Sequence, residues 1–167
     1  MDIKDLKSKV DSFNDSLDNI ERNRKQWKDS TKPLIIKTFK EIIQQFPIGW
    51  NIQFIDNFEN LEGVNLYFGA IPSGIKLITD DKAKRFIKTG GALTFSQSFN
   101  GEIYVIVYYP IIDELVGEKK PEKLGKYKPE LITKKLIIEK VSKFLDKMES
   151  WESSIHIETV GFKRNNE

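Results

Sequence analysis

Apolar side chains recur at alternating steps of three and four residues along the first 29 positions, and nearly every other position there is polar. A narrow stripe of this kind, with two apolar positions in every seven, is typical of a helix that forms a seam with another helix. In heptad terms the a positions are Ile3, Val10, Leu17 and Arg24, and the d positions are Leu6, Phe13, Ile20 and Trp27. We therefore predict a helical arm over residues 1–30, with these eight residues as its interaction surface.

The stripe is compatible with two arrangements, because the arm can pack along its own domain or pair with another chain. Arg24 is a polar residue at an a position, and polar residues at such positions can set the register of coiled coils. However, the stripe is short for a free-standing coil, and its e and g positions show no clear Glu/Lys pattern. Both arrangements remain open from the sequence, so we expect either self-association or a protein partner.

A second helix is predicted from Pro33 to Phe46, where the apolar positions occupy a broader face. Ser30 or Thr31 can cap it, and Pro33 is tolerated in a first helical turn. Pro47 ends it, because the residue before a proline is disfavoured in the helical region. The sequence thus predicts a break between the arm and this helix.

After Pro47 the apolar period changes to two, which indicates strands. The stretches that show this period are GWNIQFID (49–56), VNLYFGAI (64–71), IKLIT (75–79) and the hairpin sequence 90–110. Asn100-Gly101 is the dipeptide that a type I′ hairpin turn needs. The returning strand, 102–109, is apolar on both faces, which predicts a central strand covered on both sides.

Helical spacing returns over 129–151, and a last strand is predicted from 154 to 162. The complete prediction is an α+β fold: two N-terminal helices, a mostly antiparallel sheet of five to six strands with a central hairpin, a C-terminal helix and a final strand. The globular α+β domain would span 31–167 and carry the arm of residues 1–30.

The connection over 110–129 is long for a compact domain, and loops of that length are usually functional or disordered. Its second part, 118–128, is rich in Lys, Glu and Pro, so we expect it to be mobile and dispensable for folding. Leu124 and Tyr127 are its only sizeable apolar residues, and we predict that they contact a partner. The alternatives are a tolerated surface insertion and a flap beside a ligand.

Composition excludes several classes of chemistry. The chain has no Cys, which rules out disulfides and thiolate metal sites and fits a reducing compartment, so we expect a cytoplasmic protein. The 27 basic and 25 acidic residues nearly balance, which favours neither nucleic acid nor an anionic membrane. We find no signal peptide and no apolar run long enough to span a membrane.

No catalytic, cofactor or metal site is predicted. His156 is the only histidine, and its alternation with Ile155 and Ile157 places it on a solvent-facing side of the last predicted strand. Asp80-Asp81 is typical of a solvated turn, and Gly90-Gly91 of a close backbone approach at a strand start. The sequence contains no nucleophile elbow and no phosphate-binding loop.

These observations favour a non-enzymatic protein-interaction or oligomerisation domain. The alternative is a small-ligand-binding protein or enzyme whose pocket lies between the sheet and the helices, covered by the 110–129 loop. A third reading, nucleic-acid binding through the lysines between 119 and 135, is disfavoured because glutamates interrupt them.

Overall fold

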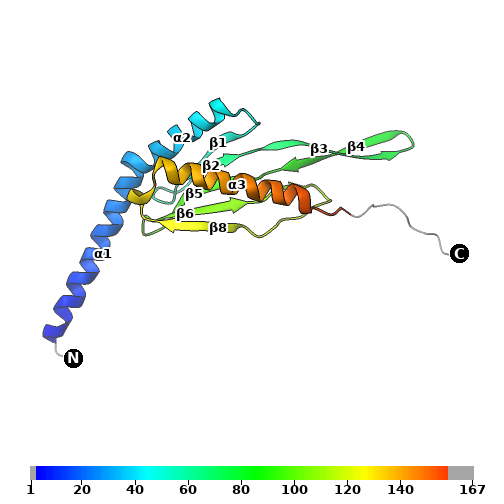
Figure 1. Cartoon of the computed structure of the whole chain (residues 1–167). Helices are drawn as coiled ribbons and strands as arrows, with labels where there is room; N and C mark the ends of the chain where they lie inside the picture. The colour runs from blue at the N-terminus through cyan, green and yellow to red at the C-terminus, as the bar shows by residue number, and fades with distance from the viewer. Residues whose placement is uncertain (1–2, 158–167) are drawn as a thin grey trace.

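The N-terminal part of the chain is one continuous helical rod. The computed structural model describes residues 3–157. A short 3-10 turn (Ile3–Asp5) leads into α1 (Leu6–Gln26), a π-helical turn (Trp27–Thr31) follows, and α2 (Lys32–Gln45) continues from it. Figure 1 shows that α1 projects away from the rest of the molecule. The two predicted helices are therefore joined end to end.

The π-helical turn explains why the predicted break does not occur. The backbone N–H of Lys32 donates to the carbonyl of Trp27, five residues earlier, which is the wider ring of a π-turn. Pro33, which has no N–H to donate, lies directly after this turn at the start of α2. Ser30 does not cap a new helix, and its Oγ donates to the carbonyl of Gln26 at 3.0 Å instead.

Within residues 3–157, eight antiparallel strands form two sheets. The larger sheet has the order β1-β2-β5-β6-β8, and its strands are β1 (Asn51–Ile55), β2 (Gly63–Tyr67), β5 (Ala92–Gln97), β6 (Ile103–Tyr108) and β8 (Glu122–Tyr127). The smaller sheet has the order β3-β4-β7, with β3 (Ala70–Thr79), β4 (Lys82–Thr89) and the two-residue β7 (Ile111–Ile112). The hairpin of β3 and β4 extends beyond the body of the domain (Figure 1).

The core lies between the five-stranded sheet and the two helices that pack on it, α2 and α3 (Lys134–Ser154). Val64, Phe95 and Val105 are register partners across three strands, and all three are fully buried on the helix side. The Phe39 ring of α2 meets the Phe95 ring edge-on at 5.8 Å between centroids. The α+β prediction is confirmed.

Strand β6 is an interior strand, between β5 and β8, but only one of its faces is covered by helices. Ile103, Val105 and Val107 are buried, whereas Tyr108 on the opposite face is 43% exposed. The prediction of a strand covered on both faces was therefore wrong. Aromatic and β-branched residues suit a half-exposed pleated surface as well as a buried one, so composition does not separate the two cases.

The predicted hairpin between β5 and β6 is present, but its turn is of another type. Gly101 has φ +78°, while Asn100 is not among the residues with positive φ. The N–H of Gly101 donates to the carbonyl of Ser98 at 2.9 Å, and the N–H of Ser98 donates to Glu102 at 2.8 Å. This is a three-residue loop with one left-handed residue, in place of a type I′ turn.

The segment 118–128 also differs from expectation, because it contains the edge strand β8. Glu122 to Tyr127 pairs with β6 along its length, with an irregularity opposite Val105 and Ile106. An edge strand tolerates charges on its free side, which is why its Lys/Glu/Pro composition resembles that of a loop. Of the predicted final strand, Ile155 to Ile157 forms no strand, and 158–162 lies outside the described residues.

We predict that Gly101→Ala destabilises the fold more than Gly74→Ala does. Both glycines have positive φ, at +78° and +84°, so both substitutions carry a backbone cost of about 1 kcal/mol. At Gly74 a Cβ atom meets nothing within 4 Å, whereas at Gly101 it would lie 2.5 Å from Cβ of Asn23 in α1. Overpacking there should add about 1–3 kcal/mol.

Urea unfolding of the two variants measures this difference directly. Equal losses of stability for Gly101→Ala and Gly74→Ala would show that the hairpin turn does not press against α1.

Candidate functional site

The heptad stripe of the arm divides into an exposed outer part and a docked inner part. The outer part, which we call the distal stripe, consists of five exposed apolar residues. Their exposed fractions are 83% for Ile3, 46% for Leu6, 54% for Val10, 61% for Phe13 and 45% for Leu17. Ile20 and Arg24 are half-buried, and Trp27 is 1% exposed. The inner residues thus pack within the chain, and the distal stripe faces solvent.

The inner end of the arm is anchored where Trp27 enters the core. The Trp27 indole Nε1 donates to Oε2 of Glu62 at 3.3 Å, and Nζ of Lys32 donates to the same oxygen at 2.5 Å. The hydrogen bond from Lys32 lowers the pKa of the Glu62 carboxyl, partial burial opposes the shift, and the indole N–H adds to the lowering. On the same turn, Thr31 is buried and its Oγ1 donates to the carbonyl of Pro129 at 3.2 Å.

The loop between β5 and β6 forms a second anchor for α1. Nδ2 of Asn23 donates to the carbonyl of Asn100 at 3.1 Å, and the guanidinium of Arg24 donates to the carbonyl of Phe99 at 2.7 Å. The Arg24 guanidinium also lies over the Phe99 ring, 5.1 Å from its centroid. The polar a position of the heptads therefore binds the hairpin of its own chain.

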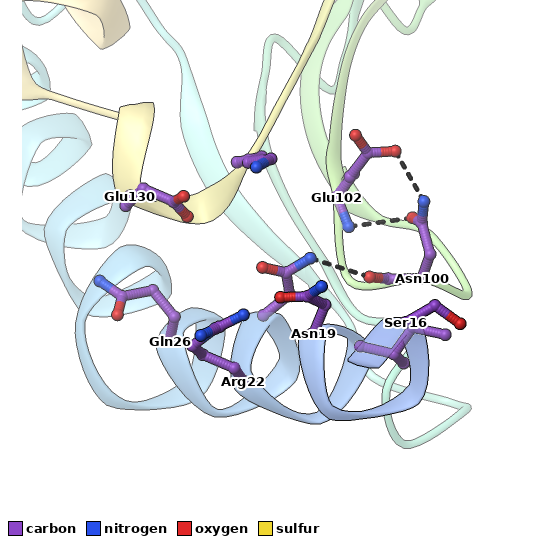
Figure 2. A pocket seen from close by; sticks show the side chains of 10 residues that line it. Ser16, Asn19, Arg22, Gln26, Asn100, Glu102 and Glu130 are labelled. Carbon is purple, nitrogen blue, oxygen red and sulfur yellow. Dashed lines mark hydrogen bonds between the residues drawn. The ribbon is translucent and has the colours of Figure 1, made fainter. Parts of the chain in front are cut away.

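A polar cavity of about 590 Å³ lies between these anchors and the segment that precedes α3 (Figure 2). It is lined by Ser16, Asn19, Ile20, Arg22, Asn23, Gln26, Asn100, Glu102, Lys128 and Glu130. The Glu102 carboxylate accepts hydrogen bonds from Nδ2 of Asn100 at 2.7 Å and from Nζ of Lys126 at 2.8 Å. The bond from Lys126 lowers the pKa of this carboxyl most, and the bond from Asn100 lowers it further. The lining offers amides and charges of both signs to a polar partner.

The cavity does not contain an activated nucleophile. Its one hydroxyl, Oγ of Ser16, donates to the carbonyl of Phe13 at 2.6 Å within the helix. Within residues 3–157 no group of three or more His, Cys, Asp or Glu side chains is placed to hold a metal ion. His156 is exposed, and Asp80 and Asp81 are exposed in the turn between β3 and β4.

The other two predicted interaction residues belong to the sheet. Leu124 and Tyr127 lie on β8, are half-buried and pack against the core. Lys140 of α3 reaches across them: its Nζ donates to the carbonyl of Leu124 at 3.2 Å and lies 5.1 Å from the centre of the Tyr127 ring. The structure therefore separates these two residues from the distal stripe, which lies on the projecting part of α1 (Figure 1).

An apolar cavity of about 410 Å³ lies beside the C-terminal half of α3, and the sequence did not identify the residues that line it. The residues that line it are Ile48, Phe68, Ile71, Lys88, Gly90, Pro110, Leu145, Met148, Glu149 and Glu152. Lys88 and Glu152 form an ion pair at its rim. The sequence feature that pointed to this place was Gly90-Gly91, which suggested a close backbone approach. A Cβ atom on Gly91 would lie 3.2 Å from Sδ of Met148, so the backbone does approach α3 closely here.

Comparisons with known proteins provide no relative from which a role could be transferred. No protein-family model matches the chain, and neither a curated protein nor a solved structure is significantly similar to it. Among the described residues, no helix combines the length and the apolar character that crossing a membrane requires.

We predict that Glu62→Gln changes how stability depends on pH. The pKa of Glu62 is lower in the folded state than its ordinary value of 4.5, so the folded state binds fewer protons and this carboxylate stabilises it above pH 4.5. That contribution is lost as the pH falls through the folded-state pKa. The stability difference between wild type and Glu62→Gln should therefore be largest near pH 7 and shrink below pH 4.5.

Chemical unfolding at a series of pH values tests this, with Glu59→Gln at a nearby exposed position as the control. A difference between wild type and Glu62→Gln that stays constant from pH 7 to pH 3 would show that the carboxylate does not hold the junction.

Proposed function

We propose that this chain is a non-enzymatic interaction domain that binds a protein partner, in the first instance a second copy of itself, through the distal stripe. The observation that carries the proposal is a helix that projects from the domain with five large apolar side chains exposed along one face. Single exposed apolar residues are ordinary on protein surfaces, but a contiguous row marks an interaction site. Their heptad spacing is what a partner helix requires.

The manner in which the arm is attached supports this role. An isolated helix of about 12–15 residues is marginally stable in water, because nucleating it costs more than its first hydrogen bonds return. Here α1 continues from α2 through a docked turn, so its nucleation has already occurred. A partner therefore meets an ordered helix, and less conformational entropy is lost on binding.

Neighbouring groups engage three of the lysines that a nucleic-acid interface would use. The ammonium groups of Lys119 and Lys123 lie 4.0 and 4.2 Å from the centres of the Tyr109 and Tyr104 rings. Lys126 is paired with Glu102 at 2.8 Å. These contacts support a protein partner over nucleic acid.

We also propose a cytoplasmic location, with which the absence of cysteine agrees.

We predict that the wild-type chain dimerises at micromolar concentration and that Phe13→Ala with Leu17→Ala abolishes the dimer. Both side chains are largely exposed, so the double substitution should change the free energy of unfolding of the monomer by only about 0.5 kcal/mol. Multi-angle light scattering and thermal melts at low concentration measure the two effects. Ser12→Ala, at an exposed position outside the stripe, is the matched control.

A wild-type chain that remains monomeric throughout the micromolar range would remove self-association from the proposal. A partner other than a second copy would then have to bind the stripe.

The apolar cavity beside α3 favours a second candidate function, small-ligand binding. Its volume of about 410 Å³ lies within the usual range for ligand sites, and Pro110, the first residue of the predicted 110–129 loop, lines it. The fluorescent probe anilinonaphthalene sulfonate should bind wild type and lose affinity for Ile71→Trp, which fills the cavity. Binding that is equal in both proteins would count against this function.

A further inference from the structure

The charges of the projecting arm are segregated along its length. Over residues 3–9 the basic side chains are Lys4, Lys7 and Lys9, and the one acidic side chain is Asp5. Over residues 11–21 the charged side chains are all acidic: Asp11, Asp15, Asp18 and Glu21. The arm is therefore basic at its outer end and acidic along its middle. The stripe residues are uncharged throughout this stretch, so the asymmetry of charge comes from the side chains around the stripe.

This segregation decides the orientation of two paired arms. In a parallel pair the lysines of one arm would lie beside the lysines of the other, and the acidic stretches would also meet. In an antiparallel pair each basic end lies along the acidic stretch of its partner. Only Lys7, Lys9 and Glu21 are at the e and g positions beside the stripe, and the other charges lie farther from it. Their attraction or repulsion therefore acts over a longer range and is strongest at low salt, because the Debye length is about 8–10 Å at physiological salt.

The docked inner part of the arm then fixes the register. In antiparallel coils, a positions of one helix meet d positions of the other. The longest overlap that stays clear of the docked Arg24 and Trp27 pairs Ile3 with the partner's Ile20. The same register brings Leu6 against the partner's Leu17 and Val10 against the partner's Phe13. Every layer is then apolar, and residues 4–9 lie opposite 14–19, within the acidic stretch.

We propose that two copies of this chain pair their arms antiparallel in this register, with the two domains at opposite ends of the paired helices. The proposal rests on the self-association proposed above and adds its geometry. The occupant of the distal stripe is the distal stripe of a second copy together with the half-buried Ile20, which meets the partner's Ile3. Electrostatic complementarity selects the antiparallel orientation over the parallel one.

Engineered cysteines test the geometry, because the chain has none of its own. Leu6→Cys and Leu17→Cys are prepared separately and oxidised under mild conditions, alone and as an equimolar mixture. In the antiparallel register, two copies of residue 6 are about 16 Å apart along the axis, at ~1.5 Å per residue. A disulfide needs Cα atoms within about 7 Å, so only the mixture should form covalent dimers efficiently.

Covalent dimers that form in either single variant alone, at the yield of the mixture, would indicate parallel arms and overturn the proposal. Light scattering on the unmodified chain separates this failure from the other one. A dimer with the wrong disulfide pattern contradicts only the geometry, whereas a monomer contradicts self-association as well.

Charge reversal provides a second test that leaves the apolar layers intact. One variant carries Lys4→Glu, Lys7→Glu and Lys9→Glu, a second carries Asp11→Lys, Asp15→Lys and Asp18→Lys, and a third carries all six changes. Each triple variant should have a dissociation constant at least about tenfold higher than that of wild type at low salt. The variant with all six changes should regain the wild-type dissociation constant. Triple variants that dimerise as tightly as wild type would contradict the antiparallel arrangement.

Discussion

The burial of Trp27 at the π-helical turn is the interaction on which the arrangement of the arm depends. Its indole is fully enclosed, and its Nε1 shares Oε2 of Glu62 with the ammonium group of Lys32. Because the turn is held by the core, α1 and α2 form one rod whose direction is set by the domain. The contact between Asn23 and Gly101 adds a second point of support, and two supports along a helix fix its direction better than one.

From this anchoring follows the exposure of the distal stripe. No residue of α1 is buried, the side chains of the distal stripe are exposed, and Figure 1 shows the outer part of α1 projecting from the domain. The helix keeps its order because it extends a docked one, and its apolar stripe is therefore exposed to water on an ordered surface. In the pairing that we propose, charge segregation selects the partner's orientation, which the apolar stripe alone would leave open.

Much of the fold could be predicted from the sequence, because the apolar period changes with the type of element. The narrow stripe, the strands and the C-terminal helix all follow from that period. The continuity of α1 and α2 could not be predicted, since it depends on the burial of Trp27 and on a hydrogen bond from Thr31 to Pro129, 98 positions away. Strand β8 was missed for a similar reason: its pairing with β6 is a tertiary contact, and its composition resembles that of a loop.

The candidate site was only partly predictable. Periodicity identifies the face of a helix that is covered, but an intramolecular and an intermolecular partner require the same face. The sequence therefore left open where the stripe packs, and the structure answers this residue by residue: Trp27 is in the core, while Phe13 is in solvent. Leu124 and Tyr127 were selected for being apolar in a polar segment, and that feature equally suits the inner face of an edge strand.

The most direct test of this account is amide hydrogen exchange of the arm as a function of protein concentration. We expect measurable protection for residues 6–20 at low concentration, because the helix is already formed, and a marked increase in protection as the chain is concentrated into the dimer range. Protection in α2 should not change with concentration. Rapid exchange of 6–20 that is the same at every concentration would contradict both the ordered arm and its pairing.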